Sequence, residues 1–155
     1  MLVALGSFDN GTPSLKFLLG GVANEKEFTA VIDTGFSGFV SMPMIQAFPL
    51  GLPLFGTTTV TLADGKSQTK LVAQGKAQLS DKQHFGLVIL ESGSSDVLIG
   101  MDFLRAFGLA LLVMKARIGL YDEEKVQKAL QEEAQDADAE AKPATRRKPK
   151  KPKPK

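Results

Sequence analysis

One carboxylate in this sequence has a setting that suits chemistry. Asp33 ends the apolar run 28–32 and is followed at once by a hydroxyl residue and a glycine, in the segment VIDTGFSG (31–38). Two interpretations are open. Asp33 is either an acid–base group of an active site or the first residue of a tight turn, because Asp hydrogen-bonds nearby backbone and Gly adopts positive φ. The triplet alone favours the turn.

The amino-acid composition excludes most other kinds of catalytic and metal-binding site. The sequence has no Cys, which excludes disulfides, thiolate nucleophiles and Cys-ligated zinc. Its single His, His84, excludes a multi-His metal site and is the only imidazole base for a serine nucleophile. We interpret His84 as a strand or turn residue near the surface. Carboxylates remain for acid–base work, and no cofactor or metal is expected.

The elements that must position Asp33 are predicted to be β-strands. Asp64-Gly65 is a two-residue hairpin signal between two apolar, β-branched runs. Short apolar stretches separated by turn residues recur along the chain, at 14–21, 26–33, 57–65, 67–75, 76–79, 84–91, 96–100, 109–114 and 117–122. Short strands with Gly-rich punctuation favour a small closed or sandwiched sheet over alternating strands and helices.

One short helix interrupts this pattern at MDFLRAFGL (101–109). Phe103, Leu104 and Phe107 have the spacing of one helix face, which indicates core residues. Asp102 is predicted to cap the start of the helix and Gly108 to end it. The fold class is therefore all-β in the main, with one short helix.

The organisation of the chain follows from its charge. The 155 residues carry a net charge of +2. We predict one β domain over 1–121, an acidic helical extension over 122–141 with pairs such as Glu124–Lys128, and a disordered Lys/Pro-rich tail over 142–155. The tail holds eight basic residues and no acidic one.

The tail allows several partners. It could bind nucleic acid, an acidic membrane surface or an acidic protein, fold back on the acidic extension, or stay solvated. It has no aromatic residue to stack on bases, so any such contact would be weak, electrostatic and salt-dependent. The sequence has no basic N-terminal region before an apolar stretch and no apolar run of about 18 residues. We therefore expect a cytoplasmic protein without a membrane span.

Two segments in this order carry a family resemblance. VIDTGFSG (31–38) and DVLIGMDFL (96–104), about sixty residues apart in a β-rich chain, resemble the retropepsin-like aspartic proteases, the single-domain relatives of pepsin. Phe-Ser-Gly after the triplet and LADG in the hairpin are most similar to bacterial members. The resemblance extends over about residues 12–121 and implies a closed β barrel that hydrolyses peptide bonds in peptides or proteins.

The resemblance also implies roles for residues. Asp33 would hold the attacking water, Thr34 would hydrogen-bond across a dimer axis, and Gly35 would present its N–H near the carboxylate. Such proteases need two carboxylates that share one proton, and this chain has one such triplet. The resemblance therefore implies a homodimer, with a flap at 57–75 whose tip, Ala63, Asp64, Gly65 and Lys66, contacts substrate.

Some residues depart from the family pattern. Phe36 stands where many members have a small residue, and it would either narrow the site or pack beneath the loop. The tip ADGK (63–66) carries charges in place of a run of glycines. Two other functions therefore stay open. One is a catalytically weak or inactive dimerising module that binds peptides, and the other is a nucleic-acid adaptor led by the tail.

Overall fold

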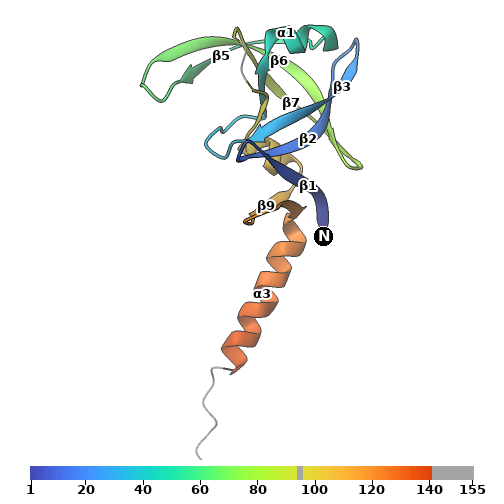
Figure 1. The fold of residues 1–155 in the computed structure, drawn as a ribbon, viewed down its shortest axis with the longest axis vertical. Helices are drawn as coiled ribbons and strands as arrows, with labels where there is room; N and C mark the ends of the chain where they lie inside the picture. The colour runs from blue at the N-terminus through green and yellow to red at the C-terminus, as the bar shows by residue number, and fades with distance from the viewer. Residues whose placement is uncertain (94–95, 141–155) are drawn as a thin grey trace, which may run out of the picture.

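The computed structural model describes residues 1–93 and 96–140 (Figure 1). Strands form most of the body, and a long helix projects from it. The elements in chain order are β1 (Leu2–Asp9), β2 (Thr12–Gly20), β3 (Glu25–Ile32), β4 (Val40–Pro43), α1 (Met44–Ala47), the 3-10 helix η1 (Phe48–Leu50), β5 (Leu54–Thr61), β6 (Ser67–Leu79), β7 (Lys82–Glu91), β8 (Leu98–Ile99), α2 (Met101–Ala106), β9 (Leu109–Val113), β10 (Ile118–Asp122) and α3 (Glu123–Glu140).

The strands form one ten-stranded mixed sheet that closes on itself. Its order is β5-β6-β7-β4-β8-β3-β2-β1-β10-β9, and β6 also pairs with β2. That extra pairing, with Leu19 opposite Ala77, closes a ring of six strands from β6 round to β2. Two pairs in the ring are parallel, β3–β8 and β4–β7. The mainly β, barrel-like fold class predicted from the sequence is confirmed.

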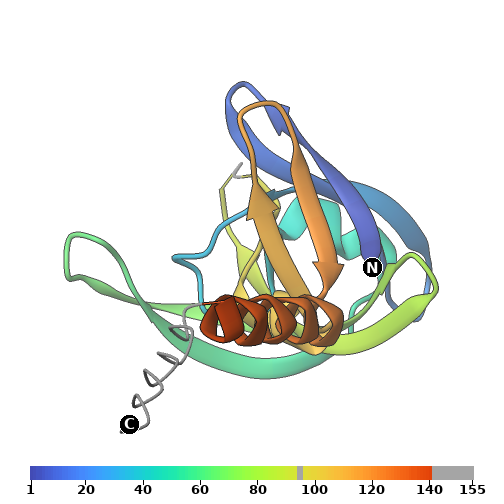
Figure 2. The same cartoon turned by 90° about the horizontal axis from the view of Figure 1, so that it is seen from below.

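Two parts of the sheet extend beyond the ring. The strands β1, β10 and β9 continue the sheet as an antiparallel extension. At the other end, the last β6–β7 pair is Leu71 with Leu90, so residues beyond it are paired only within the β5–β6 hairpin. We call this part the projecting hairpin (58–70); Figures 1 and 2 show it extending from the body in green.

The predicted strands at 67–75 and 76–79 are one strand, β6. Gly75 does not end this strand. It is a glycine because of close packing, since a Cβ at this position would come within 3.0 Å of the Leu19 and Val88 side chains. The two-residue hairpin predicted at Asp64-Gly65 is also corrected. The Leu62 N–H donates to the Lys66 carbonyl (2.8 Å), which leaves a three-residue loop, and Gly65 takes φ +81° in it.

The sequence reading missed β1, β4 and α1 with η1. Strand β4 is only four residues long, all of them buried. Such a short segment carries no alternation that could predict a strand. Strand β1 keeps Leu2 and Leu5 exposed (50% and 65%), so its apolar residues do not follow the pattern of a half-buried strand.

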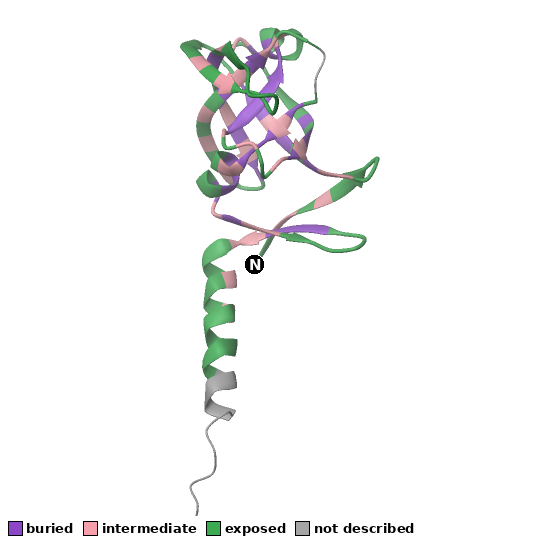
Figure 3. Ribbon diagram, turned by 90° about the vertical axis from the view of Figure 1, so that its left-hand side faces the viewer, coloured by how far each residue is buried: buried purple, intermediate pink, exposed green. Residues whose placement is uncertain are grey.

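Aromatic side chains fill the centre of the barrel. Phe103 is fully buried, and its ring centroid lies 5.3 Å from that of Phe17, 5.2 Å from Phe39 and 4.6 Å from Phe107. The prediction that Phe103, Leu104 and Phe107 are core residues is confirmed. Helix α2 therefore packs its apolar face into the core, and Figure 3 shows that the buried residues lie mainly on the strands of the body.

Phe103→Leu should lower the free energy of unfolding by about 1–2 kcal/mol, because the smaller side chain leaves a gap among three rings. Denaturant unfolding measures this loss. Phe55→Leu, at a side chain that is 68% exposed, is the matched control and should change stability by less than about 0.5 kcal/mol. Equal stability of the two variants would contradict the packing described.

The start of α2 differs from its prediction. Gly100 is the N-cap residue, and Asp102 lies in the first turn without a capping hydrogen bond from its side chain. Asp102 instead pairs with Arg105, one helical turn on (3.5 Å). The predicted end is confirmed: Gly108 follows the helix with φ +61°.

Helix α3 follows β10 directly and projects from the body (Figure 1). An ion pair along it joins Lys128 to Glu132 (4.0 Å). The helix lies within the extension predicted at 122–141, whereas the predicted disorder of 142–155 falls outside the described residues. Across 1–93 and 96–140, none of the helices has the length and apolar character needed to cross a membrane.

Candidate active site

Asp33 lies directly after β3, where the chain leaves the sheet. Its N–H donates to the Ile99 carbonyl (3.0 Å), continuing the parallel β3–β8 ladder by one residue. Its carbonyl accepts from the Phe36 N–H (3.1 Å), and its Oδ1 accepts from the Gly35 N–H (2.9 Å). The carboxylate is therefore held at the end of the half-buried strand β3, and its Oδ1 is fixed by a backbone N–H. Such a bond occurs in ordinary Asx turns too, so it does not by itself separate the two interpretations of Asp33.

The loop after Asp33 is bound to the start of α2. The Met101 N–H donates to the Phe36 carbonyl (2.8 Å), and the Gly100 N–H to the Phe39 carbonyl (3.2 Å). A Cβ on Gly100 would lie 2.3 Å from the Phe36 oxygen, so only glycine allows this approach. The two segments singled out in the sequence, 31–38 and 96–104, are thus neighbours in space, although sixty residues separate them.

Phe36 fits both alternatives left open by the sequence. Its ring packs within the loop, where a Cβ on Gly38 would come within 2.5 Å of the ring. The residue is half-buried and also lines the adjacent cavity.

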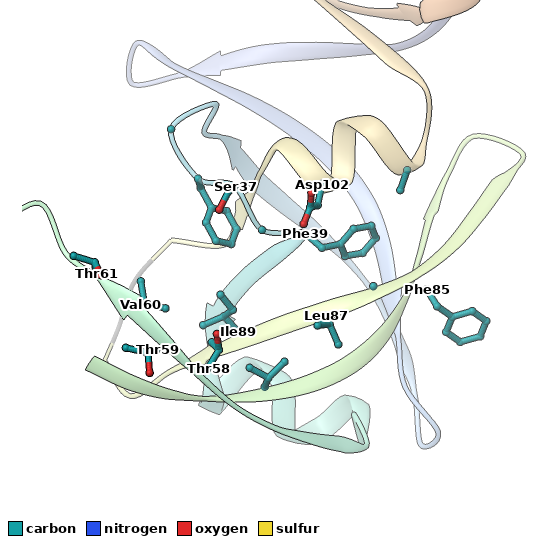
Figure 4. Close-up of a pocket in the computed structure, with 16 residues that line it drawn as sticks. Ser37, Phe39, Thr58, Thr59, Val60, Thr61, Phe85, Leu87, Ile89 and Asp102 are labelled. Atoms are coloured by element: carbon teal, nitrogen blue, oxygen red, sulfur yellow. The ribbon is translucent and has the colours of Figure 1, made fainter. Parts of the chain in front are cut away.

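A cavity of about 600 Å³ lies between this loop and the projecting hairpin (Figure 4). The loop after Asp33, strands β5, β6 and β7, and helix α2 contribute to its wall. The lining residues are Gly35, Phe36, Ser37, Gly38, Phe39, Thr58, Thr59, Val60, Thr61, Val72, Phe85, Gly86, Leu87, Ile89, Asp102 and Ala106. Aromatic and aliphatic side chains from the loop and β7 face threonine side chains from β5.

The predicted site residues lie at different distances from this cavity. Gly35 lines it, whereas Asp33 and Thr34 belong to the same loop but not to the lining. Asp33 is half-exposed and Thr34 is exposed. The tip residues 63–66 are all exposed and do not line the cavity, so their contact with substrate stays a prediction.

The two charged residues at the tip of the hairpin interact with each other. The Lys66 N–H donates to Asp64 Oδ1 (3.0 Å), and Lys66 Nζ lies 3.6 Å from Asp64 Oδ2. The charges that depart from the family pattern therefore pair with each other.

The arm of the flap predicted at 57–75, and not its tip, forms a wall of the cavity. Thr58, Thr59, Val60 and Thr61 of β5 line the cavity. The run TTTVT (57–61) predicts a strand, but nothing in it indicates which other segment it faces. Phe85 and Leu87 of β7 were missed for the same reason.

Two other titratable residues, His84 and Asp102, contact neighbouring side chains of the protein. The ring of His84 lies edge-on to Phe107, with 4.6 Å between centroids. Asp102 reaches the cavity wall while pairing with Arg105. Within the part of the chain that the structure describes, His, Asp and Glu residues form no group of three or more that could hold a metal ion.

The comparisons with known proteins agree with this geometry. Residues 19–106 match the model of the family described as "gag-polyprotein putative aspartyl protease". This match spans more than half of the chain and includes both segments that meet at Asp33. The chain therefore belongs to this family of aspartyl proteases. No curated protein matches the sequence.

A solved structure supports the fold assignment. The chain is similar to the crystal structure of a retropepsin-like aspartic protease from Rickettsia conorii, with a TM-score of 0.55 and 16% sequence identity. The similarity covers 76% of this chain and 86% of the other. At this identity the likeness concerns the fold, which is retropepsin-like.

Proposed function

We propose that this protein is an aspartic endopeptidase that acts as a homodimer, with Asp33 of each subunit forming the catalytic pair. One observation carries the proposal. The triplet of an aspartyl protease family lies at the end of strand β3, hydrogen-bonded to β8, beside a cavity walled by the projecting hairpin. A turn with no chemical role needs neither the cavity nor the second segment.

The chemistry requires two carboxylates close together. One activates water and the other donates a proton to the carbonyl oxygen. The sequence holds one Asp-Thr-Gly, and Asp102 at the cavity wall already pairs with Arg105. The simplest source of the second carboxylate is the partner's Asp33, since a two-fold axis brings the same residue from both chains together. Thr34, exposed beside Asp33, is suited to contact the partner loop.

The substrate we propose is an extended peptide. Strand β5 ends the described sheet and pairs there only with β6, so its outer edge offers N–H and C=O groups that a peptide strand could pair with. The adjacent cavity offers Phe36, Phe39 and Leu87 to an apolar side chain. Cleavage sites should therefore be enriched in large apolar residues close to the broken bond.

The surface we propose for dimer contact is the open edge of β9, the strand at the other end of the described sheet. The segment 109–114 has no charged residue or proline, the usual protections of a free edge. Leu112, Val113 and Met114 are 47%, 52% and 40% exposed. Pairing β9 with its copy would cover these side chains. Helix α2 connects β9 to β8, the strand bonded to Asp33.

We also propose the finer assignments that the sequence suggested. Phe-Ser-Gly after the triplet and LADG in the hairpin support a place among bacterial members of the family. The β domain would end near residue 121, with the helical extension and basic tail as appendages. A cytoplasmic location and weak binding of the tail to nucleic acid or other acidic surfaces complete the proposal.

Specific activity should fall on dilution, because a monomer holds only half of the catalytic pair. Digestion of a library of unstructured peptides, with protein from micromolar to nanomolar concentration, measures this, and the cleaved bonds report the preference for apolar residues. Sedimentation at the same concentrations gives the dimer fraction, which activity should follow. Full activity in a monomer would contradict the shared pair. Peptide binding without any cleavage would favour the inactive binding module.

A further inference from the structure

One ion pair differs from the exposed pairs on the surface. Lys70 Nζ lies 2.5 Å from Glu91 Oε2, and the two side chains are only 15% and 25% exposed. The pair between Lys16 and Glu27, in contrast, is 3.5 Å long with side chains 70% and 59% exposed. Charges with little surrounding water interact more strongly than charges at the surface. The Lys70–Glu91 pair is therefore able to hold two strands together.

The pair lies where the projecting hairpin leaves the barrel. The β6–β7 ladder ends with Leu71 opposite Leu90, and Lys70 and Glu91 are the next residue on each strand. Beyond this point β6 pairs only with β5, with Lys70 opposite Thr58. The side chains of Lys70 and Glu91 thus extend the contact between β6 and β7 by one step after the backbone pairing has ended.

A third strand is connected to the same pair. The Ser41 hydroxyl donates to Glu91 Oε1 (3.4 Å), and Ser41 is 5% exposed on β4. Strand β4 runs parallel to β7, with Pro43 opposite Glu91. Glu91 therefore connects the base of the hairpin to two strands of the barrel ring.

The pair also faces the side of the sheet that carries the cavity. Val72 and Ile89, two residues away on β6 and β7, line the cavity. Side chains two residues apart on a strand share a face, so Lys70 and Glu91 lie on that same face. Thr58, opposite Lys70, lines the cavity as well.

We propose that Lys70 and Glu91 are positioning residues that fix the base of the projecting hairpin and so set the place of Thr58–Thr61 over the cavity. An ion pair gives this contact a direction that an apolar contact lacks. The effect on catalysis rests on the proposed protease function, whereas the effect on the hairpin does not.

Hydrogen exchange tests the positioning without any need for activity. The test uses the full chain carrying Asp33→Asn and compares it with the same chain carrying Lys70→Met and Glu91→Gln. The double change leaves no unpaired buried charge, and the new side-chain amide at position 91 still offers an oxygen to the Ser41 hydroxyl, so the fold should persist. Amides of 58–70 should exchange at least about tenfold faster, while those of β2 and β3 should not change.

Two further variants sharpen the result. Reversal of the pair, Lys70→Glu with Glu91→Lys, should restore most of the protection. The same chemical changes at the exposed pair, Lys16→Met with Glu27→Gln, should leave exchange of the hairpin unaltered. Unchanged exchange in the Lys70/Glu91 double variant would overturn the proposal, as would equal acceleration over the whole barrel, which would indicate a general loss of stability.

Kinetics then connect the pair to the site. If the parent protein cleaves peptides, the Lys70→Met/Glu91→Gln variant should raise KM about tenfold, change kcat less than threefold, and recover on charge reversal. A fall in kcat with KM unchanged would contradict a role in substrate positioning. If the parent cleaves nothing, the proposed function fails while the exchange experiment still decides whether the pair holds the hairpin.

Discussion

Asp33→Asn should abolish peptide hydrolysis while the protein remains folded. The amide has nearly the size of the carboxyl group, but it cannot take a proton from water, so the rate should fall at least about a thousandfold. The Gly35 N–H can still donate to the side-chain oxygen at position 33. Stability should therefore change by no more than about 1 kcal/mol.

Cleavage of an unstructured protein between roughly pH 4 and 7 measures the effect, since a pair that shares a proton works only while one proton is bound. Asp81→Asn is the matched control. It makes the same chemical change at an exposed residue of the β6–β7 turn and should leave hydrolysis unaltered. Equal activity of Asp33→Asn and the unmodified protein across that range would mean that Asp33 is only a turn residue.

Val113→Pro should convert the dimer to monomers and reduce specific activity at least about a hundredfold at concentrations where the unmodified protein is dimeric. The Met114 N–H donates to the Arg117 carbonyl, within the β9–β10 hairpin. Since N–H groups alternate in direction along a strand, that of Val113 points to the open edge. Proline there removes a donor of the proposed seam and blocks close approach of the partner strand, while the hydrogen bonds to β10 remain.

Val113→Ala is the control for this substitution, because it shortens the side chain but keeps the N–H. It should dimerise nearly as well as the unmodified protein. Sedimentation gives the mass of each variant, and circular dichroism gives its β content. A Val113→Pro variant that stays dimeric and active would show that the subunits meet elsewhere.

Local sequence signals were enough to predict most of the strands around the site. Strands β2 and β3, β5 and β6, and β9 and β10 are pairs of neighbours in the sequence, so turn residues and apolar runs indicate them. The same holds for the end of α2 at Gly108. The local signal was wrong where a tertiary contact determined the residue type. Gly75 indicated a break between two strands, whereas it lies inside the single strand β6, where close packing against Leu19 leaves no room for a side chain.

The sequence by itself determined the candidate carboxylate, since Asp33 is the one aspartate in an Asp-Thr-Gly triplet that follows an apolar run and precedes a matching second segment. Only the tertiary structure decided what surrounds it. Three interactions join residues far apart in the chain: the hydrogen bond from the Asp33 N–H to the Ile99 carbonyl, the pairing of β2 with β6, and the ion pair between Lys70 and Glu91. Their register depends on how all the strands pack at once, and that information is not contained in any local pattern of residues.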